Sequence, residues 1–188
     1  HPPEFAENTH NFSENILTTD SLSSIHATEF FSAHDINWDP SEFDGVGNPI
    51  EDAEHWNYQM LADSCGVAAQ LSILESFTNT EISESKLLAI AIAEGEYCPG
   101  RGTFPNKLGS TLERLGLEVE RQYNASLEDI EASLARGNKV LVGLDSSEIW
   151  EPKRDIFGNP VEQQPDVGHV VWVTGIDDTP DGKVVIVN

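Results

Sequence analysis

The clearest apolar pattern in the chain predicts a buried helix over residues 64–77. Val67, Leu71, Leu74 and Phe77 recur at the three- and four-residue spacing of a helix, and neighbouring apolar residues widen this stripe. A stripe of this width is typical of a helix that packs against a protein core.

Start and stop signals predict three more helices. They are expected over residues 83–94, 106–115 and 126–136. The first carries Glu84 in its first turn, and the second ends at a glycine suited to a helix C-cap. The third opens on Ser126 as N-cap, with Asp129 at the capping-box position.

The pattern then changes to short runs of β-branched residues bounded by turn residues. Strands are expected over residues 139–144, 169–175 and 183–187, with a hairpin connection between the last two. The proline-containing segment 150–167 is expected to be an exposed loop. Helices first and strands later, without regular alternation, indicate an α+β domain with an antiparallel sheet.

The beginning of the chain differs from the rest. Residues 1–44 are rich in Ser, Thr, Asn, Asp and Glu, with scattered apolar residues, which predicts an acidic polar arm or linker. A turn-prone stretch over residues 44–49 marks the entry to the globular part. We therefore expect one domain over residues 45–188.

The charge of the chain narrows the classes of partner. Asp and Glu number 33 against 10 Lys and Arg, which gives a formal net charge of -23. Such a surface repels phosphate backbones and anionic lipid, so neither nucleic acid nor a membrane surface is an expected partner. The charge indicates solubility, or alternatively attraction of a basic peptide. No signal peptide or membrane-spanning run is evident, which favours a cytoplasmic location.

Cys65 precedes Gly66 at the start of the first predicted helix. A cysteine of this kind is commonly a small buried apolar residue. However, a helix N-terminus and a nearby imidazolium both lower the pKa of a thiol, and the thiolate is the nucleophile. Gly66 is expected to let a substrate backbone approach closely. Cys98 lies in a turn-like sequence and is expected to be structural.

Three further residues favour a catalytic role for Cys65. Gln59 stands six residues earlier, where its amide and the Cys65 N–H can both donate to a developing oxyanion. His169 opens a strand, and Asn188 follows the next strand, so a hairpin places Asn188 alongside the imidazole to orient it. The sequence therefore predicts Cys65 as nucleophile and His169 as base, in a reaction that needs no metal or organic cofactor. His55 is expected to have a surface or packing role.

The order and spacing of these residues resemble the papain-like cysteine peptidases. The matching motifs are Gln59-x5-Cys65-Gly66 before an apolar helix, Gly168-His169 before an apolar strand, and the run that ends in Asn188. The resemblance is strongest to the bacterial branch related to bacteriocin-processing leader peptidases and their stand-alone relatives. It implies a helical N-terminal half that carries the Cys helix and a C-terminal antiparallel sheet that carries the His.

The resemblance also implies an activity. A papain-like protein of this kind is a cysteine peptidase that hydrolyses a peptide or protein substrate. The leader-peptidase branch generally uses Asp as third member, whereas this chain has Asn188, as papain does; an acidic residue beyond Asn188 is the alternative. The same site suits a deamidase or transamidase, and a papain-like fold can also be a catalytically inactive domain that binds peptides or proteins.

Overall fold

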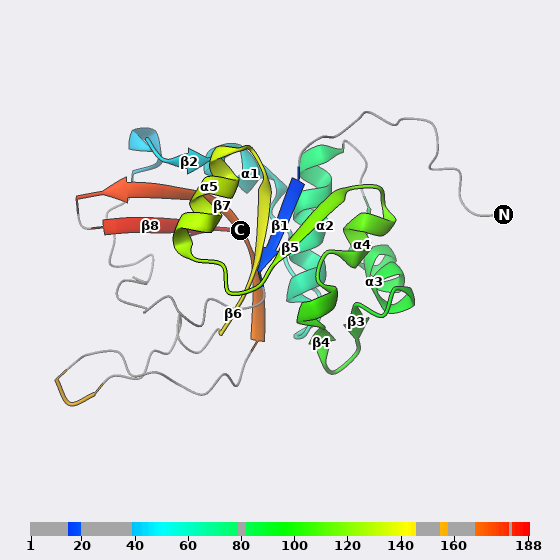
Figure 1. Cartoon of the computed structure of the whole chain (residues 1–188). Helices are drawn as coiled ribbons and strands as arrows, with labels where there is room; N and C mark the ends of the chain where they lie inside the picture. Colours follow the sequence, from blue (N-terminus) through cyan, green and yellow to red (C-terminus); the bar gives the residue numbers. More distant parts are fainter. Residues whose placement is uncertain (1–14, 20–38, 79–81, 146–154, 158–167, 181) are drawn as a thin grey trace.

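The computed structural model of the chain describes residues 15–19, 39–78, 82–145, 155–157, 168–180 and 182–188. The helices α2, α3 and α4 gather at one side of the molecule, and α5, β7 and β8 lie at the other side (Figure 1). The strands β1, β5 and β6 lie between them. This combination of helices and a largely antiparallel sheet confirms the expected α+β class. Within these ranges, no helix has the length and apolar character that crossing a bilayer requires.

The helices follow the sequence signals closely, apart from a short first helix that is not among those expected and the helix expected over residues 106–115. Their bounds are α1 Pro49–Asp52, α2 Cys65–Phe77, α3 Glu84–Ala93, α4 Ser110–Arg114 and α5 Leu127–Ala135, with short 3-10 turns η1 Pro40–Glu42, η2 Ala53–His55 and η3 Pro105–Lys107. The capping box of Ser126 and Asp129 is present at the start of α5. The single helix expected over residues 106–115 is wrong, because Gly109 has a φ of 89° and separates η3 from α4. This left-handed conformation cannot continue a right-handed helix.

The strands form a larger sheet than the sequence pattern predicts. They are β1 Asn15–Thr19, β2 Val46–Gly47, β5 Glu118–Gln122, β6 Lys139–Asp145, β7 Gly168–Thr179 and β8 Gly182–Val187, besides the small hairpin of β3 Tyr97–Cys98 and β4 Gly102–Thr103. Within the described residues the six larger-sheet strands run in the order β2-β7-β6-β1-β5, with β8 also paired to β7. The loop expected over 150–167 lies outside the described residues, except for the exposed residues 155–157.

Two strands have no clear signal in the sequence. β1 lies inside the segment expected to be a polar arm, and it pairs in parallel with β5 on one side and β6 on the other. β5 has the mostly polar sequence Glu-Val-Glu-Arg-Gln, which lacks the alternation of a typical half-buried strand. Pairing with distant segments therefore selects these strands, and part of the predicted arm is a strand of the sheet.

β7 is the strand that pairs with β6, β8 and β2. Val173 pairs with residues of both β6 and β8, so these antiparallel strands flank β7 on opposite edges. The strand extends through Thr179, beyond the predicted end, which leaves a shorter hairpin turn before β8. Its first half borders β6 and its second half borders β8 and β2.

The sheet separates two apolar cores made of described residues. On one face, α2, α3 and α4 pack around Leu141 and Trp172. On the other face, α5 covers Val140, Val142 and Val171. Neighbouring residues of β6 and β7 therefore serve opposite cores, as strand alternation requires. Every residue of α2 from 66 to 74 is buried, which holds the start of that helix firmly against β7.

Candidate active site

A pocket of about 530 Å³ opens where the start of α2 meets the start of β7. The loop before α2, the first turns of α2, the first residues of β7 and the end of the chain line it. All four residues singled out in the sequence are among the lining residues: Gln59, Cys65, His169 and Asn188. Three segments far apart in the sequence supply them, so the fold itself brings these residues to one place.

Cys65 is the first residue of α2 and is half-buried. The N–H groups in the first turn of a helix have no acceptor within that helix. The hydroxyl of Ser64 donates to Glu84 at 2.6 Å, and among the described residues it caps no N–H of α2. The backbone N–H groups of Val170, Gly66 and Cys65 act on the thiol by lowering its pKa, because they favour the thiolate. Val170 follows His169, and both line the same pocket as Cys65.

The electrostatic state of the pair differs from the sequence-based expectation. Burial raises the pKa of the Cys65 thiol, and the backbone N–H groups oppose this shift only in part. Burial also lowers the pKa of the His169 imidazole from its ordinary value of 6.5. Both shifts favour the uncharged form, because desolvation penalises an ion. The expectation of a lowered thiol pKa is therefore wrong, and the pair rests as a neutral thiol and a neutral imidazole.

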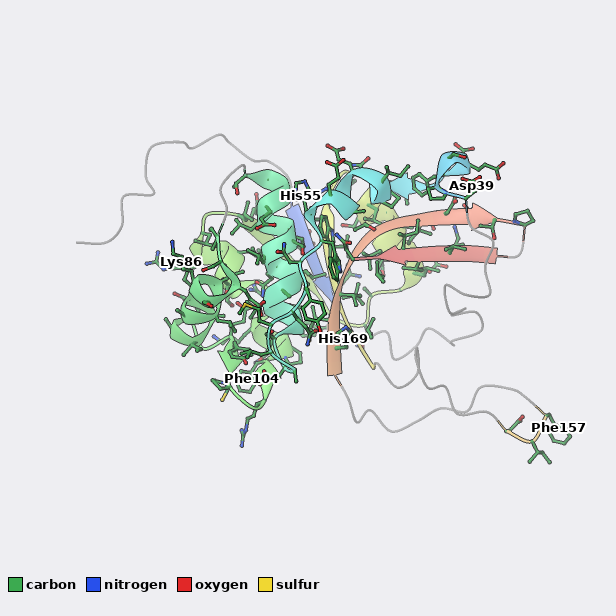
Figure 2. The ribbon with its side chains drawn as sticks, turned by 180° about the vertical axis from the view of Figure 1, so that it is seen from behind. Asp39, His55, Lys86, Phe104, Phe157 and His169 are labelled. Atoms are coloured by element: carbon green, nitrogen blue, oxygen red, sulfur yellow. The ribbon has the colours of Figure 1, made fainter. Side chains whose placement is uncertain are left out.

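His169 is the second residue of β7 and is half-buried. Figure 2 shows it near the start of this strand, on the side of α2 and well apart from His55. β6 supports it from the neighbouring edge, where Leu144 is its pairing partner. His55 ends η2 outside the pocket lining, which agrees with a surface or packing role.

Asn188 follows β8 directly and is fixed at both its backbone and its side chain. Its backbone exchanges two hydrogen bonds with Trp172 of β7, at 2.8 and 3.3 Å. Its Nδ2 donates to the carbonyl oxygen of Asp52 at 2.8 Å. Asp52 is held in turn by a buried ion pair with Lys139, at 2.6 Å. With Nδ2 used in this way, the amide orientation is set and Oδ1 is the acceptor that the side chain offers elsewhere.

We expect Asn188→Asp to destabilise the protein although it barely changes the shape of the side chain. Aspartate has no N–H for the Asp52 carbonyl, and an acceptor that loses its donor costs about 1–3 kcal/mol. The melting temperature should therefore fall by roughly 2–10 °C, measured by differential scanning calorimetry. Asn106→Asp is the matched control, because Asn106 is exposed in η3. Equal melting temperatures for the two variants would contradict the assigned role of Nδ2.

Gln59 lies in the loop between η2 and α2. Its Nε2 donates to the carbonyl oxygen of Leu61 at 2.8 Å. A side-chain amide carries two N–H donors, and this bond uses one of them. The loop thus holds the Gln59 amide at the wall of the pocket that also contains Cys65.

Glu84 is a supporting residue that the sequence pattern assigns only to the first turn of a helix. It is 5% exposed, and its carboxylate accepts hydrogen bonds from the Ser64 hydroxyl at 2.6 Å and from the Met60 N–H at 2.9 Å. These bonds join α3 to the loop that carries Gln59 at one end and Cys65 at the other. No motif signals this contact, because it connects segments twenty or more residues apart.

The β3–β4 hairpin gives the start of α2 a second support. The carboxylate of Asp63 accepts from the Tyr97 hydroxyl at 2.7 Å and from the Gly100 N–H at 2.6 Å. Burial and this bond to Asp63 raise the pKa of Tyr97 to about 12. A Cβ on Gly66 would lie 2.5 Å from Thr103 Oγ1. Gly66 is therefore required for close packing against β4, whereas its expected role in the approach of a substrate stays a prediction.

Replacing Glu84 should loosen the loop that carries the site residues. Glu84→Ala removes the acceptor for two donors, and we expect the free energy of unfolding to fall by about 1–3 kcal/mol. Amide hydrogen exchange over residues 59–64 should become faster at the same time. Glu118→Ala is a suitable control, since it removes an exposed carboxylate on β5. If amide hydrogen exchange over residues 59–64 proceeds at the wild-type rate in both variants, Glu84 does not anchor this loop.

Cys98 does not join the site. It lies in β3, is half-exposed, and is not among the residues that line the pocket.

Comparisons of the chain with models of protein families, with curated proteins and with solved structures return no match. Function is therefore inferred from the chemistry of the pocket, where a thiol, an imidazole and two amide side chains meet at a helix N-terminus.

Proposed function

We propose that the protein is a papain-like cysteine peptidase that hydrolyses peptide bonds at Cys65. The supporting observation is the convergence of Gln59, Cys65, His169 and Asn188 on one pocket. Each has the chemistry its proposed role needs, and the order along the chain is that of the papain-like proteins. A cysteine at a helix N-terminus beside a histidine is a recurring arrangement for acyl transfer.

The proposed reaction begins with the neutral pair. As the Cys65 sulfur attacks the carbonyl carbon of the substrate, its proton passes to the His169 imidazole. The carbonyl oxygen becomes an oxyanion that accepts hydrogen bonds from Gln59 Nε2 and the Cys65 N–H. The imidazolium then gives its proton to the leaving amine, the C–N bond breaks, and a thioester remains on Cys65.

Hydrolysis of the thioester completes the cycle. His169 removes a proton from a water molecule that attacks the thioester carbon, and the C–S bond breaks. The proton returns to the sulfur, and the carboxylic acid product leaves. Asn188 Oδ1 orients the imidazole by accepting from its N–H, while Nδ2 stays bound to the Asp52 carbonyl. No step requires a group other than these residues, the substrate and water.

A peptide-binding domain without catalysis is the second candidate. The raised pKa of Cys65 and the hydrogen bond of Gln59 to its own loop are the observations that favour it. Deamidation or transamidation would use the same thioester with ammonia release or an amine acceptor. These reactions differ from hydrolysis in their products and not in the residues of the site.

A thiol-directed epoxide built on a peptide amide tests the proposal. Under reducing conditions it should label Cys65 and leave Cys98 unlabelled, as mapped by mass spectrometry of the digested protein. A peptide library treated with the wild-type protein should then show chain cleavage. Conversion of Gln to Glu, or cross-linking without cleavage, would replace peptidase by one of the other amide reactions. If Cys65 is not labelled and no product of any kind forms, the peptide-binding domain without catalysis is the candidate that remains.

A further inference from the structure

Large apolar side chains are exposed at the mouth of the pocket. Trp56, Tyr58, Met60 and Leu61 are 58%, 76%, 66% and 45% exposed, and all four line the pocket. We call these four residues the apolar rim. Scattered exposed apolar residues are ordinary on a soluble protein, but a contiguous group beside a pocket is typical of a recognition surface.

The apolar rim is held in place by the polar groups between its members. Asn57 Nδ2 donates to Glu75 of α2 at 2.7 Å and to the His55 carbonyl at 3.1 Å. The Met60 N–H is bound to Glu84. The rings of Trp56 and Tyr58 contact each other edge to face, with centroids 6.1 Å apart. The exposed side chains therefore stand on an anchored backbone, which reduces the entropy lost when a ligand covers them.

Behind the rim, apolar residues contribute to the pocket wall. They include Ala68 and Ala69 of α2 and Val170 and Val171 of β7. Among the described lining residues none is Lys, Arg, Asp or Glu. A charged side chain would lose its hydration here without a partner, whereas an apolar side chain gains from burial. The pocket therefore suits a bulky apolar group.

The stretch of chain that carries the rim has charge of one sign. Residues 39–78, which include the rim and the start of α2, contain Asp and Glu but no Lys or Arg. Glu51 and Glu54 are exposed just before Trp56. A ligand with positive charges beside its apolar group is attracted by this surface, and an acidic ligand is repelled.

We infer that the apolar rim binds a bulky apolar side chain of an extended peptide that carries Lys or Arg at the flanking positions. This inference rests on the proposed function for the position of the reacting amide, which lies at Cys65 beside the bound side chain. It names the class of substrate: basic peptides with a large apolar residue next to the cleaved bond. Binding itself needs no turnover and can be measured separately.

The test measures binding to the Cys65→Ala variant by fluorescence anisotropy of labelled peptides. Three peptides of equal length are compared: Leu between Lys residues, Ser between Lys residues, and Leu between Glu residues. The Leu–Lys peptide should bind roughly 10- to 100-fold more tightly than the Ser–Lys peptide, because a buried Leu side chain contributes that much. The difference in affinity between the Leu–Lys peptide and the Leu–Glu peptide should shrink as salt is added.

A double substitution identifies the surface responsible. Tyr58→Ser with Met60→Ser should remove most of the preference for Leu over Ser, whereas Ile92→Ser with Phe104→Ser should keep it. Ile92 and Phe104 are exposed apolar residues outside the pocket lining. Equal binding of the three peptides, or equal behaviour of the two double variants, overturns the inference. If the wild-type protein cleaves peptides without an apolar preference, the inference about the rim is overturned and the peptidase proposal stands. If the peptides bind as expected but none is turned over, the inference is supported and only the peptidase proposal is overturned.

Discussion

Cys65→Ala is expected to abolish turnover of a peptide substrate and to leave the fold intact. In the proposed mechanism only Cys65 forms the thioester, while His169 and the two amides support the reaction. Removing a nucleophile that works with a base as one unit lowers kcat by a factor on the order of 10⁶. The side chain is half-buried and small, so alanine leaves little empty space. The comparison requires kcat/KM on one peptide and the melting temperature of both proteins.

Cys98→Ala is the matched control for this experiment. It is the same substitution at the other half-exposed cysteine, which lies on β3 outside the pocket. This variant should keep the wild-type kcat/KM. If Cys65→Ala also keeps it, the peptide bond is not cleaved through this thiol and the catalytic proposal is wrong. A loss of activity in both variants, with lowered melting temperatures, would instead indicate a shared effect on the fold.

The parts of the fold that were predictable from the sequence are those that local physics determines. α2 follows from its apolar stripe, and α5 follows from a capping box that Ser126 and Asp129 form between themselves. β6, β7 and β8 follow from runs of β-branched residues. In each case the residues that carry the signal lie within the helix or strand that they specify, or directly beside it.

Other features depend on contacts that no local pattern contains. β1 and β5 pair with distant segments, β1 from within a stretch that is polar overall and β5 with a mostly polar sequence of its own. Glu84 resembles any acidic residue in a first helical turn, yet its carboxylate supports the loop before Cys65. The pKa of Cys65 was misjudged for a similar reason. A helix N-terminus is visible in sequence, whereas the burial that outweighs it is a property of the packed pocket.

The residues of the candidate site come from segments that are far apart in the sequence. Gln59 and Cys65 share one loop and helix start, but β7 brings His169 to them and the hairpin with β8 brings Asn188. The orientation of Asn188 then depends on Asp52, which the ion pair with Lys139 holds against β6. This chain of contacts gives a structural reason for an amide after β8, because its Nδ2 donates to the Asp52 carbonyl.

His169→Gln should lower kcat/KM nearly as much as Cys65→Ala, because nucleophile and base act as one unit whose losses are not additive. The double variant should therefore be no worse than either single variant. In the wild-type protein the base must be neutral to take the thiol proton. Burial lowers the pKa of His169 below 6.5, so activity should persist at pH 6.5 and fall only as the pH drops further, through that lowered pKa.

Alkylation of the thiols gives a measurement of the same pair that does not depend on turnover. With iodoacetamide near neutral pH, Cys65 reacts through the small fraction of thiolate that forms when its proton moves to His169. Gln cannot accept this proton, and burial then keeps the thiol protonated, so the alkylation rate of Cys65 should fall in His169→Gln. Cys98 in the same protein should react at an unchanged rate and serves as the internal control. A Cys65 rate that is the same in both proteins would show that His169 does not exchange a proton with this thiol, and the pair would have no part in catalysis.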